Sequence, residues 1–191
     1  MDTRGACSLW YSYEIRNAKG KIVKKSKPRI SKSFVIAYAR WLYLKFVRPT
    51  TQTITDTTGN SRSKDGYEPL TTTATSSTST DGLVVGTGTN AVALADTALQ
   101  TQIAHGTGAG QLSYGASVVN LPSSDSTSTS LIMTRVFSNG SGGTVTIREI
   151  GVYSLMPSSG THRFCIIRDV VTIALANGDQ LTLNYIMKTT V

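Results

Sequence analysis

The chain has 191 residues, a formal net charge of +8 and a charged fraction of only 16%, well below the ~25% of an ordinary globular protein. Its 17 glycines and many serines and threonines favour a β-protein with frequent turns over a helical bundle, a coiled coil or a charged disordered chain. Two cysteines and two histidines exclude a disulfide framework and leave little material for a metal site, so we expect no cofactor. No apolar run reaches the ~18 residues of a membrane span, and residues 1–4 lack the layout of a signal peptide. We therefore expect no membrane contact, and a protein that stays in the cytoplasm where it is made.

Positive charge and aromatic side chains concentrate in the first quarter of the chain. Residues 1–48 hold 12 Lys and Arg against 2 Asp and Glu, whereas residues 49–191 hold 7 against 9. The first quarter also carries 8 of the 14 aromatic residues. These differences divide the chain into a basic aromatic N-terminal region (1–48), a Ser/Thr-rich loop or linker (49–81) and a β-domain (82–191).

The N-terminal region is predicted to form a basic hairpin followed by one helix. Residues 9–16 alternate as a strand does, residues 17–20 have turn chemistry, and residues 21–25 can return as a second strand. Aromatic and apolar residues then recur at helical spacing, which predicts an amphipathic helix over residues 33–47 with Ser31 or Ser33 as its cap. The aromatic stripe of this helix fits either core packing or a partner interface.

Residues 71–80 contain only Ser, Thr and Ala. So polar a tract buries too little apolar surface to order itself, which predicts a long surface connection. Because Thr favours strands, an exposed polar strand is the alternative.

The β-domain is predicted from short apolar segments that alternate with turns. Residues 131–138 and 144–153 flank a Gly-rich turn, and residues 164–173 and 180–188 flank the Asn177-Gly178 turn, so we expect two hairpins. The last strand places Leu181, Leu183, Tyr185 and Met187 on one side and Thr182, Asn184 and Ile186 on the other. This pattern predicts a mainly β fold, an antiparallel sandwich or jelly roll. Residues 91–103 fit either a helical turn or a loop.

Few residues indicate catalysis. The Gly-rich segment after His105 lacks both the nucleophile elbow of a hydrolase and the strand–loop–helix context of a dinucleotide site, so we interpret it as a structural loop. Arg148-Glu149 and Arg168-Asp169 place charges inside apolar strands, where neighbouring residues point to opposite faces. We expect Arg148 or Arg168 to form structural ion pairs between strands or between subunits. Cys165, between two apolar residues, is expected to be reduced and packed. We therefore expect no enzymatic activity.

An ordered set of short segments resembles a family of virion structural proteins of tailed bacteriophages, and it covers most of residues 30–191. Upstream, Ser33-Phe34-Val35 opens the predicted helix and the sequence ITDTTG follows. The other segments are GLVVGTGT (82–89), IAHG (103–106), QLSYGA (111–116), REIGVY (148–153), IRDV (167–170) and NGDQLTLNY (177–185). The resemblance implies a non-enzymatic, β-rich component of the particle.

Head decoration proteins and tail or baseplate proteins share such sequences. The first hypothesis is a capsid decoration or cement protein, bound to the major capsid protein or to neighbouring virion proteins, with a homotrimer favoured. It places the protein in the virion, assembled in the host cytoplasm. A tail, fibre or baseplate component is the first alternative. A coat protein whose basic region contacts nucleic acid is the second, and a hydrolase on a β-scaffold is the third.

Docking is expected to rest on residues 1–48, and the β-domain is expected to fold without residues 1–30. Aromatic residues and arginine are enriched in the cores of protein interfaces, and basic runs bind acidic surfaces. The predicted partner-binding residues are Trp10, Tyr11, Tyr13, Lys21, Lys24, Lys25, Lys27, Arg29 and Trp41.

Overall fold

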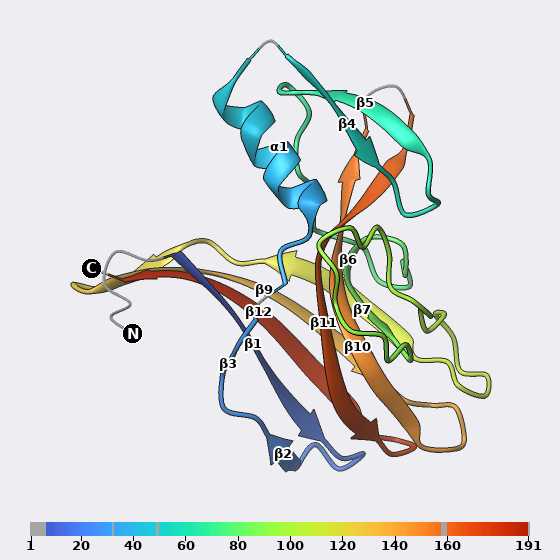
Figure 1. Ribbon diagram of the computed structural model, residues 1–191. Coiled ribbons are helices and arrows are strands. Elements are labelled where there is room, and N and C mark those ends of the chain that lie inside the picture. Colours follow the sequence, from blue (N-terminus) through green and yellow to red (C-terminus); the bar gives the residue numbers. More distant parts are fainter. Residues whose placement is uncertain (1–6, 32, 49, 158–159, 191) are drawn as a thin grey trace.

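A computed structural model describes residues 7–31, 33–48, 50–157 and 160–190 (Figure 1). The fold is mainly β, with one helix, α1 (Ile36–Phe46), among the described residues. The strands are β1 (Cys7–Arg16), β2 (Ile22–Lys25), β3 (Arg29–Ile30), β4 (Thr51–Thr55), β5 (Ser61–Asp65), β6 (Gly82–Gly86), β7 (Ser113–Val119), β8 (Ser123–Ser124), β9 (Ser128–Ser138), β10 (Val145–Met156), β11 (His162–Leu175) and β12 (Gln180–Thr190).

Among the described residues, every pair of strands is antiparallel, and the strands form three sheets. The largest has the order β2-β1-β12-β9-β7, with β3 added to β1 and β8 added to β9. A three-stranded sheet has the order β11-β10-β6, and β4 and β5 form a separate hairpin beside α1 (Figure 1). The two larger sheets share one core, because side chains of β7, β9 and β12 bond to groups on β6 and β11.

Both hairpins predicted for the β-domain are wrong. β9 and β12 lie in the seven-stranded sheet, whereas β10 and β11, which follow and precede them, lie in the three-stranded sheet. Each predicted turn therefore carries the chain from one sheet to the other. The strands that do pair are β9 with β12 and β10 with β11. Turn residues determine that the chain reverses, but they leave open whether the flanking strands pair with each other.

The two crossovers lie side by side and are joined through Asn139. This side chain is 2% exposed, and its Nδ2 donates to the carbonyl oxygens of Gly143 (2.8 Å) and Leu175 (2.7 Å). The backbone N–H of Gly178 donates to the carbonyl oxygen of Asn139 at 2.7 Å. Gly178 has a φ of 85°, a left-handed conformation that glycine adopts without steric strain.

β1 belongs to the main sheet, so residues 1–48 do not form a separate unit. It pairs with β12 over ten residues, from Cys7 opposite Thr189 to Arg16 opposite Gln180. Its alternate residues Leu9, Tyr11, Tyr13 and Ile15 are buried in the core. Removing residues 1–30 would leave β12 paired only with β9 and would open this core. This arrangement argues against the expectation that the β-domain folds without them.

The predicted helix is present, but neither serine caps it. α1 begins at Ile36 after Val35, and no side chain caps its N-terminus. Ser31 and Ser33 are buried, and their hydroxyls donate to the carboxylate of Asp169 on β11. They tie the segment before α1 to the sheet instead.

The Ser/Thr tract is a surface connection, as predicted. None of residues 71–80 is buried. The tract touches the sheets through backbone bonds of Thr71 with Leu155 and of Ala74 with Ser117. Residues 91–103, which the sequence left undecided, form a loop without a helix.

Candidate partner-binding surface

The predicted cationic residues lie together at one edge of the seven-stranded sheet. β2 and β3 both pair with β1 and form this edge. Lys25 lies 3.7 Å from the carboxylate of Glu14, which Arg16 also contacts at 2.7 Å. We call the exposed cations of this edge the basic edge: Lys19, Lys21, Lys24, Lys25, Lys27 and Arg29.

The basic edge has two physical roles to consider. Lysines on an edge strand discourage unwanted strand pairing with another chain. The same charges attract an acidic partner, although each exposed ion pair is worth only about 0–1 kcal/mol. The neighbouring apolar side chains Ile22 and Val23 are 42% and 53% exposed. An edge that only guarded against aggregation would not need these apolar groups, so their exposure favours the binding role.

Trp10 lies on the outer face of the same sheet, in a row of apolar side chains. Strand register places Trp10 opposite Ile30 of β3 and Ile186 of β12, and Ile186 opposite Ile132 of β9. Ile30 is 55% exposed, and the other three are half-buried. We call these four side chains the apolar row, and the apolar row together with the adjoining basic edge the docking face. Within that edge, Lys24 and Arg29 lie opposite the inner-face residues Ile15 and Tyr11, so these two cations lie at the rim.

Ile30, Ile132 and Ile186 were not among the predicted site residues. One signal was present, because Ile186 is the only apolar residue on the otherwise polar side of the predicted last strand. Its importance depends on strand register, which brings it beside Trp10 across the sheet.

The structure removes Tyr11 and Tyr13 from the predicted surface. Both are buried, at 8% and 6% exposure, because successive residues of a strand point to opposite faces and these two share the inner face. The ring of Tyr11 packs edge-on against Tyr185, with centroids 6.3 Å apart. The ammonium of Lys24 lies 5.8 Å from the ring centroid of Tyr13. These tyrosines therefore belong to the core beneath β1 and are not available to a partner.

Trp41 lies away from the basic edge, in an apolar groove beneath α1. It is half-buried, and its indole Nε1 is a buried donor with no hydrogen-bond partner among the described residues. The groove has a volume of about 480 Å³, and we call it the α1 groove. It is lined by Phe34, Tyr38, Trp41, Leu70, Thr71, Thr72, Thr73, Val119, Leu131, Met133, Ile166, Ile167 and Met187.

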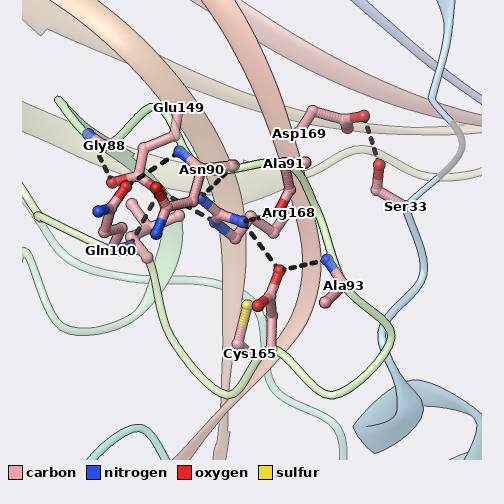
Figure 2. A network of polar contacts seen from close by, with 12 residues as sticks. Ser33, Gly88, Asn90, Ala91, Ala93, Gln100, Glu149, Cys165, Arg168 and Asp169 are labelled. Carbon is pink, nitrogen blue, oxygen red and sulfur yellow. Dashed lines mark hydrogen bonds and ion pairs between the residues drawn. The ribbon is translucent and has the colours of Figure 1, made fainter.

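Glu149 and Arg168 form a buried ion pair between β10 and β11, one of the kinds of ion pair expected for Arg168 (Figure 2). Arg168 Nε donates to Glu149 Oε2 at 3.0 Å, and Arg168 Nη1 donates to Asp96 at 2.8 Å. Glu149 also accepts bonds from the backbone N–H groups of Gly88, Gln100 and Thr101. Apart from the Arg168–Glu149 pair, which joins β11 to β10, these contacts attach the loop at 88–101 to the three-stranded sheet, so the geometry is structural.

Asp169, the neighbour of Arg168, makes a second buried cluster that consists of hydroxyl donors. Ser31 and Tyr185 donate to its Oδ2 at 2.6 and 2.7 Å, and Ser33 donates to its Oδ1 at 2.7 Å. Burial, together with the adjacent carboxylate, raises the pKa of Tyr185 well above its ordinary value. The phenol therefore stays protonated and serves as a donor between the two larger sheets.

Arg135 on β9 is a buried cation that the sequence analysis missed. It is 0% exposed, and it donates to the carbonyl oxygens of Gly115, Asp81 and Leu83, each at 2.8 Å, and to that of Thr78. Burial lowers its pKa to about 10, so the guanidinium remains charged at neutral pH. The sequence did contain an indication of this burial, because Arg135 alternates with the apolar residues Met133 and Phe137 in a predicted strand.

The segment after His105 makes internal contacts. His105 Nδ1 accepts the backbone N–H of Tyr114 at 3.1 Å, and Gly110 has a φ of 75°. Cys165 is a buried free thiol, and Cys7 is exposed. Within the described ranges, no group of three or more His, Cys, Asp and Glu side chains is arranged to hold a metal ion. No helix in that part of the chain is long and apolar enough to cross a membrane.

Comparison of the chain with protein-family models, with curated proteins and with solved structures finds no match. The docking face therefore has to be interpreted from its own chemistry.

Proposed function

We propose that the protein is a non-enzymatic structural protein of a virion, which attaches to a neighbouring protein subunit through its docking face. The class of particle is suggested by the resemblance to virion proteins of tailed bacteriophages. Among the roles which that resemblance implies, capsid decoration on the major capsid protein is favoured. The scaffold proposed for this role is a two-sheet antiparallel sandwich.

The observation that carries the proposal is the apolar row beside the basic edge. Binding energy at protein interfaces concentrates in a few large side chains, with Trp and Arg prominent, surrounded by polar groups that exclude water. Trp10 with its isoleucine neighbours fits the central part, and the lysines fit the rim. Charge on the rim accelerates and orients binding to an acidic surface more than it adds affinity.

The proposal can be tested by co-sedimentation with particles that lack the native copy. Ile30→Ser should weaken binding at every salt concentration, because it removes the most exposed member of the apolar row. Replacing Lys24, Lys25 and Lys27 with Ala should weaken binding mainly at low salt, where exposed charges are screened least. Leu121→Ser is the matched control, since Leu121 is 90% exposed and lies outside the docking face.

Different results would point elsewhere. Undiminished binding of both docking-face variants would refute the proposed face. Sedimentation with isolated tails and not with heads would favour a tail, fibre or baseplate component. Binding to nucleic acid with a steep salt dependence would favour the nucleic-acid-contacting coat protein.

A further inference from the structure

All five exposed residues of α1 are apolar. Phe46 is 79% exposed and Tyr43 is 45% exposed, while the opposite side of the helix contributes Ala37 and Leu44 to the core. Apolar side chains on both the inward and the outward side of a helix are normally covered on both sides. We call the exposed set the α1 stripe: Ile36, Ala39, Leu42, Tyr43 and Phe46.

The basic residues of the helix do not interrupt the α1 stripe, because they bond toward the chain's own backbone. Arg40 Nη1 donates to the carbonyl oxygen of Thr53 at 2.7 Å. Lys45 Nζ donates to the carbonyl oxygens of Gly66 (2.9 Å) and Glu68. The outward side of α1 is thus left without charge, which suits an apolar partner surface.

The spacing of the stripe makes it complementary to itself. Ile36, Ala39, Tyr43 and Phe46 are separated by three, four and three residues, which is the spacing of a coiled-coil seam. If two copies pair antiparallel, Ile36 lies opposite Phe46 and Ala39 lies opposite Tyr43. The two pairs, Ile36 with Phe46 and Ala39 with Tyr43, are both centred on residue 41. A single two-fold axis that passes near residue 41 therefore brings both pairs into contact. The small Ala39 leaves room for the large Tyr43 of the other copy.

Charge at the two ends of α1 favours the same antiparallel arrangement. At the N-terminal end, Ile36 N–H donates to Leu94 O at 2.8 Å, which places the loop containing Asp96 there. The carboxylate of Asp96 lies there, 2.8 Å from Arg168. The C-terminal end carries the exposed Arg48. Antiparallel pairing brings Asp96 of one copy toward Arg48 of the other and opposes the two helix dipoles.

Exposed apolar side chains extend the patch beyond both helix ends. Leu94 is 74% exposed beside Ile36. At the other end, Val47 is 39% exposed, and Tyr67 is 65% exposed beneath the guanidinium of Arg48. In the antiparallel arrangement, Leu94 of one copy approaches Val47 of the other, which enlarges the contact beyond eleven helical residues.

We propose that a second copy of this chain covers the α1 stripe, with its own α1 packed antiparallel, to form a two-fold dimer. The proposal is independent of the docking face, which lies on other elements. It also differs from the homotrimer expected from the resemblance, because an isologous helix pair closes after two copies.

The test begins with the mass of the full chain in sedimentation equilibrium. The unaltered protein should have twice the 20.4 kDa mass of one chain. Ala39→Lys and Phe46→Glu should each give monomers with an unchanged circular dichroism spectrum, because both side chains are exposed in a single chain. The dissociation constant of Phe46→Glu should rise at least ~30-fold, as expected for loss of an interface hot spot. Leu121→Glu, the matched control, should remain a dimer.

A mixing experiment tests the register. Ile36→Lys and Phe46→Glu should each be monomeric alone but form a heterodimer when mixed. Antiparallel pairing places the introduced lysine of one chain opposite the introduced glutamate of the other and keeps the remaining Ile36–Phe46 pair. Parallel pairing would bring together no such ion pair. A monomeric or trimeric unaltered protein, dimers of the single variants, or failure of the mixture to associate would each overturn the proposal.

Discussion

Replacing Arg135 with Leu should destabilise the protein severely. Arg135 lies on β9. Its guanidinium donates to backbone carbonyls of β6, of β7 and of the segment before β6. Its guanidinium carbon also lies 4.8 Å from the ring centroid of Tyr114. Leucine fills part of the volume, but it donates no hydrogen bond, so four carbonyl oxygens lose their partner.

The size of the effect follows from those four acceptors. A buried polar group that loses its partner costs ~1–3 kcal/mol. The Thr78 carbonyl lies in the surface tract and can turn to water, which leaves three acceptors to consider. The loss is reduced because burying the guanidinium is itself unfavourable, as the lowered pKa of Arg135 indicates. We therefore expect a net loss of about 3–5 kcal/mol in the free energy of unfolding, a large part of the 5–15 kcal/mol typical of a domain.

Guanidinium unfolding monitored by circular dichroism measures this loss directly. Arg148→Leu is the matched control, because Arg148 lies on β10 with its side chain exposed, and surface changes usually stay within ~0.5 kcal/mol. If Arg135→Leu and Arg148→Leu had unfolding free energies within ~1 kcal/mol of each other, the role assigned to Arg135 would be refuted.

Three further predictions concern the crossovers, acid stability and the thiols. Asn139→Ala should lower the unfolding free energy by about 2–3 kcal/mol in the same assay, because two carbonyls at the crossovers lose their donor; an unchanged midpoint would contradict this. Burial disfavours the charged form of Asp56, but bonds from Thr58, Arg62 and Asn60 outweigh it and hold its pKa below the ordinary value. Its contribution is therefore present above the unfolded pKa of ~3.9 and lost as the pH falls below it, so acid should destabilise the unaltered protein more than Asp56→Asn. With a thiol reagent near pH 8, Cys7 should react in the folded protein, while Cys165, whose pKa burial raises to about 12, should react only after unfolding.

Strand positions could be predicted from the sequence, because alternation of apolar and polar residues is a local property. The β1–β2 hairpin, the helix and the surface position of residues 71–80 follow from such local signals. Sheet membership could not be predicted in the same way. Asn139 and Gly178 are residue types that favour tight turns. The hydrogen bonds of Asn139 with Leu175 and Gly178, however, connect two crossovers that are far apart in sequence.

The site was predicted in part, for a related reason. Exposed lysines could be anticipated from their density, and they do gather on one edge. Tyr11 and Tyr13 were misplaced because aromatic content alone does not tell which face of a strand is covered. Alternation put Trp10 on the face opposite to them, and only strand register showed that Ile186 is its neighbour. An ion pair of Arg168 between strands could be anticipated from charges in apolar strands, but neither Glu149 as its partner nor the loop contacts could.

The α1 stripe and the docking face reinforce each other if both proposals hold. The basic edge alone gives weak attachment, since each exposed ion pair contributes about 0–1 kcal/mol. A dimer joined through α1 carries two docking faces, and on a repeating particle surface that both can reach, the second contact becomes intramolecular. Such linkage can raise the overall affinity ~10²–10⁴-fold without any new contact. Phe46→Glu should therefore lower particle binding in co-sedimentation although its docking face is intact, and Leu121→Glu should not. Equal binding by monomer and dimer would mean that one docking face suffices, and it would confine the α1 contact to assembly of the free protein.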